Sequence, residues 1–312
     1  MEPQNIDFST LNIARIGHNF LSKLTDGNYT VDELNRINAY INFVLTKENR
    51  DFKKLKIGLM FVCINENYWP YIKPVVTDAK TFFLPWHEVE IMVWTDMPSY
   101  EGVTLFPVES VGWPYPTLMR YHMFLKQEEY LKKFDYLFYL DLDMRIVNII
   151  GDEILGDGLT AAEHPMYSLR NNLYPPYEPN PKSASYIPRP GKVIQDEGKP
   201  RFRPYYFAGG FQGGTTETFI PAMKGTKKLI DADLTMNYIP IWNDESAWNR
   251  YLFDNPPSVV LSPSYVYPDS MINEYYIKIW GRDYPKKIIT LTKPFSISSE
   301  GGKAATEMIK TL

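Results

Sequence analysis

Short apolar runs alternate with amphipathic stretches between residues 57 and 140, and this alternation restricts the chain to few folds. Helices are expected at residues 68–83 and 117–133, and strands at residues 57–64, 89–95, 103–108 and 136–140. Apolar strands separated by helices are typical of a mostly parallel sheet flanked by helices. The sequence therefore predicts an α/β fold, with its ligand site beyond the carboxyl ends of the strands.

Two acidic residues follow the last of these strands, in the sequence Asp141-Leu142-Asp143. Side chains alternate along an extended chain, so both carboxylates are expected to point the same way, with Leu142 directed into the core. Such a pair can bind one divalent cation and leave positions for phosphate oxygens or water. The alternative is a solvated turn, because so short a motif is common by chance.

Residues 242–246, Trp-Asn-Asp-Glu-Ser, place Asp244 and Glu245 at the start of a helix expected over residues 244–253. Acidic residues are common in a first helical turn for structural reasons alone. Their other possible role is a carboxylate beside the Trp242 ring, suited to an oxocarbenium-like sugar centre.

A glycine-rich run at residues 207–214, Phe-Ala-Gly-Gly-Phe-Gln-Gly-Gly, is either an irregular strand or a place where a ligand approaches the backbone. It matches neither the P-loop nor the dinucleotide-binding pattern. A helix is expected at residues 216–231, a long proline-rich loop at 171–204, and a helical stretch before His164.

Composition excludes several classes of protein. The net charge of −4 argues against nucleic-acid binding, which needs a basic surface. There is no zinc motif, no G-x-S-x-G element, no signal peptide and no apolar run long enough to cross a membrane. With Cys63 as the only cysteine, a cytoplasmic protein is expected, unless the chain is part of a longer anchored one.

Taken together, residues 56–293 resemble glycosyltransferase family 6, which includes the histo-blood group A and B transferases and the α1,3-galactosyltransferases. Six segments carry the resemblance, in order and at similar spacing: residues 136–143, 164–165, 185–188, 206–215, 242–246 and 261–265. The resemblance implies a GT-A fold, Mn²⁺ and a UDP-GalNAc or UDP-Gal donor. It also implies an enzyme that adds the sugar, with retention, to the 3-hydroxyl of a β-galactoside acceptor, which could be fucosylated.

The resemblance assigns roles to individual residues. Glu245 matches the catalytic glutamate, and Asp141 and Asp143 match the metal ligands, with Asp143 the more direct. Acceptor positions are His164, Trp242 and Asp269. The remaining donor and nucleotide positions are Phe61, Cys63, Tyr68, Arg120, Leu142, Ala208, Gly209, Gly210, Asp244, Lys286, Lys287 and Lys293.

Departures from the family concern mainly the acceptor side. Asn243 replaces a usual histidine, Pro176 replaces a threonine, Asp269 is shifted by one position, and residues 189–204 are an insertion. Many bacterial members replace D-x-D with N-x-N, so the two aspartates kept here predict metal dependence in a microbial or viral protein. Gly210 leaves room for an N-acetyl group and so favours UDP-GalNAc over UDP-Gal.

The resemblance also suggests boundaries within the chain. We expect an accessory helical segment at residues 1–54, one GT-A catalytic domain at residues 55–296, and a flexible tail at residues 297–312. A nucleotide-sugar hydrolase and a non-catalytic sugar-binding protein remain as alternatives.

Overall fold

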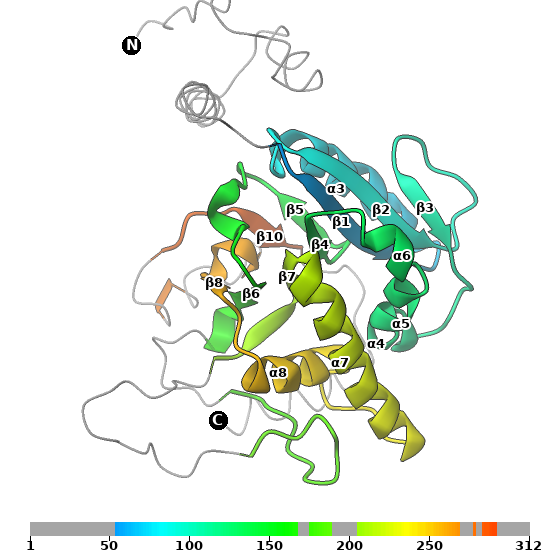
Figure 1. Cartoon of the computed structure of the whole chain (residues 1–312), viewed down its shortest axis with the longest axis vertical. Helices are drawn as coiled ribbons and strands as arrows, with labels where there is room; N and C mark the ends of the chain where they lie inside the picture. The colour runs from blue at the N-terminus through cyan, green and yellow to red at the C-terminus, as the bar shows by residue number, and fades with distance from the viewer. Residues whose placement is uncertain (1–53, 168–174, 189–204, 269–276, 279–282, 292–312) are drawn as a thin grey trace, which may run out of the picture.

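A computed structural model describes residues 54–167, 175–188, 205–268, 277–278 and 283–291 of the chain. The expected N-terminal helical segment and the expected C-terminal tail therefore lie outside the described residues, apart from Lys54. The described part is an α/β structure built around one large sheet (Figure 1). This agrees with the predicted fold class.

The large sheet has seven strands in the order β3-β2-β1-β4-β7-β6-β8. Four pairs of neighbours are parallel, β3 with β2, β2 with β1, β1 with β4, and β6 with β8, whereas β7 is antiparallel to both β4 and β6. The strands are β1 (Lys56–Cys63), β2 (Glu88–Thr95), β3 (Thr104–Pro107), β4 (Tyr136–Leu140), β6 (Leu159–Glu163), β7 (Phe207–Thr215) and β8 (Val259–Leu261).

The pairing of β4 with β7 has a fixed register, in which Phe138 lies opposite Gly213 and Leu140 lies opposite Phe211. A Cβ atom on Gly213 would come within 2.2 Å of the Phe138 ring and 2.5 Å of the Leu137 carbonyl oxygen. Only glycine therefore allows the two strands to approach in this register.

Helices cover both faces of the sheet, each over its own hydrophobic core. Helix α3 (Trp69–Phe82) packs its apolar side chains against the face that carries Ile57, Leu59 and Phe138. The opposite face is covered by α4 (Tyr115–Leu118), α5 (Arg120–Leu125), α6 (Glu128–Leu131), α7 (Thr216–Thr235) and α8 (Asp244–Asp254). Figure 1 shows α7 and α8 together on this side, with α5 beside α7.

A second sheet of three strands lies after the acidic motif. It consists of β5 (Met144–Ile146), β10 (Ile288–Thr290) and β9 (Tyr267–Pro268), in the order β5-β10-β9. Arg145 of β5 forms an ion pair with Asp78 of α3, and its Nη2 lies 3.1 Å from Asp78 Oδ1. The chain immediately after Asp143 is thus fixed both to β10 and to α3.

Two expectations for secondary structure were wrong. The helix expected at residues 117–133 is three short helices, α4, α5 and α6. Within α5, the Met123 carbonyl accepts a hydrogen bond from the Trp94 indole. The Gln127 amide bonds to Phe124 instead and the helix ends there. The stretch before His164 is the strand β6, because pairing with β7 and β8 outweighs the helix propensity of its alanines.

The glycine-rich run forms the strand β7, and its pairing with β6 shifts register between Ala161 and Glu163, so the irregular strand considered for it is what forms. The helix expected at residues 216–231 continues to Thr235, and the one expected at residues 244–253 is α8. Among the described residues, no helix combines the length and apolar character needed to span a membrane.

Candidate active site

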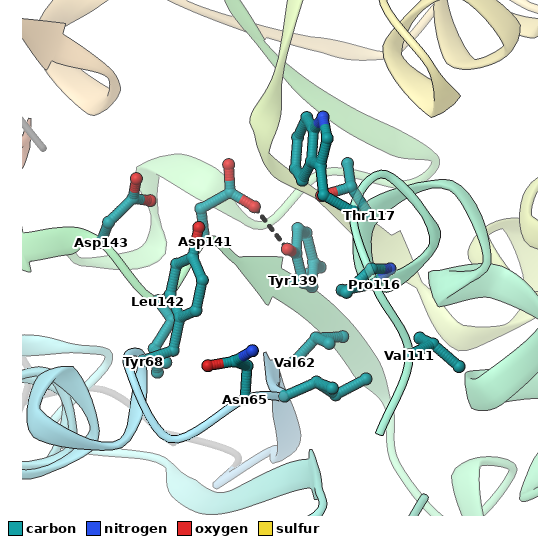
Figure 2. Close-up of a pocket in the computed structure, with 12 residues that line it drawn as sticks. Val62, Asn65, Tyr68, Val111, Pro116, Thr117, Tyr139, Asp141, Leu142 and Asp143 are labelled. Atoms are coloured by element: carbon teal, nitrogen blue, oxygen red, sulfur yellow. Dashed lines mark hydrogen bonds between the residues drawn. The ribbon is translucent and has the colours of Figure 1, made fainter. Parts of the chain in front are cut away.

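A cavity of about 350 Å³ opens where β1 and β4 end, as predicted for the ligand site of such a sheet (Figure 2). Its apolar wall is formed by Val62, Ile64, Val111, Trp113 and Pro116. Its polar wall is formed by Asn65, Tyr68, Thr117, Tyr139, Asp141 and Asp143, with Leu142 between the two acids. One end of the cavity thus suits a flat apolar group and the other a charged group.

The acidic motif is a turn rather than extended chain, because β4 ends at Leu140. Both carboxyl groups are nevertheless directed to the same side of the turn (Figure 2). The turn is anchored at both ends, since the Asp141 amide donates to the Gly210 carbonyl at 2.9 Å and the Leu291 amide donates to the Asp143 carbonyl at 2.9 Å. Leu142 is buried in the core under α3, as expected.

Arg120 connects this motif to the first turn of α8. Arg120 is 2% exposed, and its guanidinium lies 3.4 Å from Asp141 Oδ1, 3.2 Å from the Gly209 carbonyl oxygen and 2.7 Å from Asp244 Oδ2. It also stacks on the Tyr139 ring, whose hydroxyl donates to Asp141. Burial alone would lower the pKa of Arg120, but the neighbouring carboxylates raise it well above its usual value, so the guanidinium stays charged.

Glu245 lies at the other side of this group, in the first turn of α8, and is held by two donors. The Tyr206 hydroxyl donates to its Oε1 at 2.7 Å, and the Gly209 amide donates to its Oε2 at 2.6 Å. Burial raises the pKa of Glu245 to about 7, although both hydrogen bonds favour the charged form. Its ionisation therefore falls close to neutral pH, as is common for catalytic carboxylates.

Asp244 is fully buried beside Arg120. Burial raises its pKa to about 6, against the opposing charge of Arg120. Its Oδ1 has no hydrogen-bond partner from another residue in the described part of the chain, which leaves one acceptor for a ligand. A buried acceptor without a donor costs free energy unless a bound group supplies one.

The two glycines of β7 separate these acids. A Cβ atom on Gly209 would lie 3.2 Å from Glu245 Oε2, and one on Gly210 would lie 2.9 Å from Asp141 Oδ2 and 2.4 Å from the Met144 methyl group. The backbone of β7 therefore passes between the two carboxylate groups at a distance that side chains would not allow.

The turn into α8 has an unusual backbone. Asn243 has φ 53° and ψ −127°, and the Glu245 amide donates to the Trp242 carbonyl at 3.1 Å across it. This is the geometry of a type II′ turn, which favours glycine at the position of Asn243. The helix is also fixed to β7, because the Asn249 amide group bonds to both the N–H and the C=O of Phe207, each at 2.8 Å.

The described part of the proline-rich loop, residues 175–188, lies against the aromatic residues of the site. The Trp242 indole donates to the Pro176 carbonyl at 3.0 Å, and Tyr177 packs on Tyr206. His164 also packs on Tyr206, and burial lowers its pKa to about 4, so the ring is neutral at pH 7. The two expected acceptor residues in the described structure thus both lie in the aromatic group around Tyr206.

Other expected residues are placed differently. Phe61 and Cys63 are buried under α3, and Val62 and Ile64 of the same segment line the cavity instead. Tyr68 lines the cavity and Ala208 lies in the core under α3. The Lys287 ammonium donates to the Ile149 carbonyl and lies 3.4 Å from Glu153, and Lys286 lies over the Tyr267 ring. Lys293 and Asp269 lie outside the described residues.

Several cavity and site residues were missed from the sequence. Tyr139 was expected only as part of an apolar strand, and Tyr206 was not named as a site residue, although both hydroxyls donate to a site carboxylate. Trp113 and Pro116 stand in the run Trp113-Pro114-Tyr115-Pro116, whose aromatic and proline content was the available signal.

No group of three or more histidine, cysteine or acidic side chains is close enough to hold a metal ion within the described residues. Asp141 and Asp143 together offer hard oxygen ligands at the polar wall of the cavity, which is a fitting but incomplete set for Mn²⁺ or Mg²⁺. A cation held there would need further ligands from a bound diphosphate or from water.

The chain is similar in sequence to known glycosyltransferases. The family model for glycosyltransferase family 6 matches residues 38–281 and so begins within the segment expected to be accessory. Histo-blood group ABO system transferase 1 of Rattus norvegicus is 30% identical over 244 residues, which are 74% of this chain and 66% of that protein. Globoside alpha-1,3-N-acetylgalactosaminyltransferase 1 of Homo sapiens is 30% identical over 227 residues, which are 69% of this chain and 62% of that protein.

A bacterial relative is covered more completely. O-antigen biosynthesis glycosyltransferase WbnI of Escherichia coli is 28% identical over 233 residues, which are 73% of this chain and 94% of that protein. The chain spans slightly less than two thirds of the rat and human relatives. Since the family model covers well over half of the 312 residues, the chain belongs to glycosyltransferase family 6.

Proposed function

We propose that the protein is a retaining glycosyltransferase that moves GalNAc, or less readily Gal, from a UDP-sugar to the 3-hydroxyl of a β-galactoside, forming an α1,3 linkage. One observation carries the proposal: the acids Asp141 and Glu245 flank the Gly209–Gly210 backbone, and Arg120 connects the first of them to Asp244. The α1,3 linkage is the one in the name of the human globoside relative.

The cavity suits the nucleotide half of such a donor. Its apolar wall, which includes Val62 and Trp113, would take the uracil ring, and its polar wall would take the diphosphate. Asp141 and Asp143 would hold Mn²⁺, which neutralises the charge that develops on the leaving diphosphate. Because the Lys287 ammonium is engaged by Ile149, Lys286 is the better candidate of the two lysines for a phosphate contact.

Glu245 suits the sugar half of the donor. Its carboxylate is fixed by two short hydrogen bonds, so it would not reorganise as positive charge develops at the anomeric carbon. It would act by attack on that carbon or by stabilising its charge, and the departing phosphate would take the proton of the acceptor hydroxyl. The free Asp244 oxygen would accept a hydrogen bond from a sugar hydroxyl.

The preference for GalNAc rests on Gly210. Its position next to Asp141 is adjacent to the diphosphate end of the cavity, and a methyl group there would reduce the space for the 2-substituent of the sugar. One methyl group in a pocket is worth only about 1–3 kcal/mol of discrimination, so some transfer of Gal is expected.

The decisive experiment is a matrix of UDP-GalNAc and UDP-Gal against a panel of β-galactosides, with and without Mn²⁺, read by product mass. We expect a metal-dependent product with both donors and a higher yield from UDP-GalNAc. Release of UDP that no acceptor accelerates would indicate a hydrolase, and binding without UDP release would indicate a sugar-binding protein.

A variant tests the role of Glu245 in the same assay. Glu245→Gln should lose at least a hundredfold in transfer while its affinity for UDP stays within twofold of wild type. Glu217→Gln is the matched control, because Glu217 is an exposed acid in the first turn of a different helix, α7. Near-wild-type transfer by Glu245→Gln would contradict the catalytic role.

A cytoplasmic location remains a prediction from the sequence.

A further inference from the structure

Two fully buried carboxylates attach the segment 175–188 to the rest of the protein. They are Glu178, which belongs to the segment itself, and Asp233, which lies near the end of α7. Each accepts three hydrogen bonds, and each is 0% exposed. A buried charge is tolerated only where donors satisfy it, so both attachments are specific.

Glu178 joins the segment to the chain that leads into α8. Its Oε1 accepts from the Tyr238 hydroxyl at 2.7 Å and from the Asn180 amide at 2.9 Å. Its Oε2 accepts from the Ile241 amide at 2.8 Å. Ile241 immediately precedes Trp242, so this bond fixes the backbone on which the indole ring stands.

Asp233 holds the far end of the segment, where its carboxylate accepts hydrogen bonds from residues 183–185. Its Oδ1 accepts from the Ala184 amide at 2.7 Å. Its Oδ2 accepts from the hydroxyls of Ser183 and Ser185, both at 2.9 Å. The two carboxylates therefore have similar burial and the same number of donors, but only Glu178 connects the segment to the Trp242 turn.

A closed path of contacts runs from Glu178 to Glu245. The Trp242 indole returns to the segment at Pro176, and the adjacent Tyr177 packs on Tyr206, whose hydroxyl holds Glu245. A shift of Glu178 relative to Ile241 would therefore move Trp242 and the aromatic wall around Tyr206 together. The cavity formed by β1 and β4 takes no part in this path.

We propose that Glu178 is a positioning residue that sets the acceptor side of the site by holding Ile241, and through it Trp242, against segment 175–188. This inference rests on the proposed function, and it assigns to Glu178 an effect on acceptor binding that leaves nucleotide binding unchanged. Asp233 stabilises the same segment without this effect.

The chemistry of the donors suggests a pair of variants. In Glu178→Gln, the new amide NH₂ must face either the Asn180 N–H or the Ile241 N–H, because each carboxylate oxygen accepts from a backbone donor. In Asp233→Asn, the NH₂ can face the two serine hydroxyls, which can rotate to accept. Both variants remove one buried negative charge, but only the first leaves a clash of two donors.

The test measures three quantities for both variants: the acceptor KM and kcat, the calorimetric affinity for UDP with Mn²⁺, and the rate of UDP-sugar hydrolysis without acceptor. We expect Glu178→Gln to lose at least tenfold in kcat/KM for the acceptor, mainly through KM, with UDP affinity within twofold of wild type. Hydrolysis should fall less than acceptor transfer, because the path of contacts reaches Glu245 only through Tyr206. Asp233→Asn should stay within twofold in all three.

The outcomes separate the inference from the proposed function. An unchanged acceptor KM in Glu178→Gln, or an equal loss of UDP affinity, would overturn the positioning role alone. A wild-type protein that transfers sugar to no acceptor would overturn the proposed function, and the inference with it. Circular dichroism of each variant at the assay temperature verifies that the protein measured is folded.

Discussion

The strained turn before α8 allows a sharp test of the described backbone. Asn243, with φ 53° and ψ −127°, occupies a region that residues with a Cβ rarely adopt, and its side chain forms no capping hydrogen bond. Replacement by glycine should relieve the strain without removing a capping hydrogen bond. We therefore expect Asn243→Gly to be more stable than the wild type.

The magnitude follows from two opposing effects. A residue in such a region costs about 1–3 kcal/mol. Glycine also lowers the stability by roughly 0.4–1 kcal/mol, because it increases the conformational entropy of the unfolded chain. The net gain is about 1 kcal/mol, which raises the Tm of a domain of this size by roughly 2–4 °C.

Asn237→Gly is the matched control. Asn237 also has φ 53°, but it follows the end of α7, where its amide donates to the Leu234 carbonyl at 3.0 Å. Asparagine is well tolerated in the left-handed helical conformation that commonly ends a helix. This variant should therefore change the free energy of unfolding by no more than about 0.5 kcal/mol.

The measurement is thermal and urea unfolding of the wild type, Asn243→Gly and Asn237→Gly, each without ligands, which gives their free energies of unfolding. The reasoning is refuted if Asn243→Gly is no more stable than Asn237→Gly, since the two substitutions have the same effect on the unfolded chain. A loss of stability would mean that the Asn243 side chain makes a contact that outweighs the strain.

Three further predictions concern the site. Asp143→Asn should abolish the increase in UDP affinity that Mn²⁺ produces in calorimetric titrations, and equal titrations with and without metal in the wild type would contradict this. Burial raises the pKa of Glu245 to about 7, and the proposed role requires its charged form. The donor kcat/KM should therefore rise as the pH is raised through about 7 and then level off. A flat profile between pH 5 and 9 would contradict this. Gly210→Ala should weaken metal-dependent UDP binding, because the added methyl group pushes the Asp141 carboxylate aside. Gly112→Ala is the control and should leave UDP binding unchanged, because a Cβ atom there meets nothing within 4 Å. Isothermal titration of both variants measures the difference.

Some of the fold followed from the sequence because local and tertiary signals agree there. The strands β1 and β4 are largely apolar runs, and such runs are buried in the middle of a sheet. The acidic motif was placed correctly because the end of an apolar strand is visible in the sequence. The start of α8 was visible as acids followed by a helical pattern.

Other elements depend on partners that are distant in the sequence. Within α5, the Met123 carbonyl bonds to the Trp94 indole, which lies 29 positions earlier in the chain. The strand β6 exists because β7 and β8 flank it, and its own residues favour a helix. Neither partner could be inferred from the local pattern.

The acidic residues of the candidate site could be named from the sequence, but the residues that hydrogen-bond to them could not. Asp141, Asp244 and Glu245 could be named because carboxylates are distinctive in an apolar or aromatic context. The donors to them, Tyr139 and Tyr206, look like ordinary core aromatics until the sheet brings each hydroxyl to an acid. Their role depends on strand register, which single-sequence reasoning could not supply.

The register of β4 against β7 has a consequence for how this protein can vary. The distance between the Asp141 and Glu245 carboxylates depends on the register of the backbone hydrogen bonds between β4 and β7. Gly213, which lies under the Phe138 ring, fixes that register because a larger residue would clash there. A slip of two residues would displace the groups by about 6.6–7 Å. Changes of length between residues 188 and 205, before β7 begins, leave that register unaltered. The chain can therefore gain or lose residues before β7 while the spacing between these two carboxylate groups is kept.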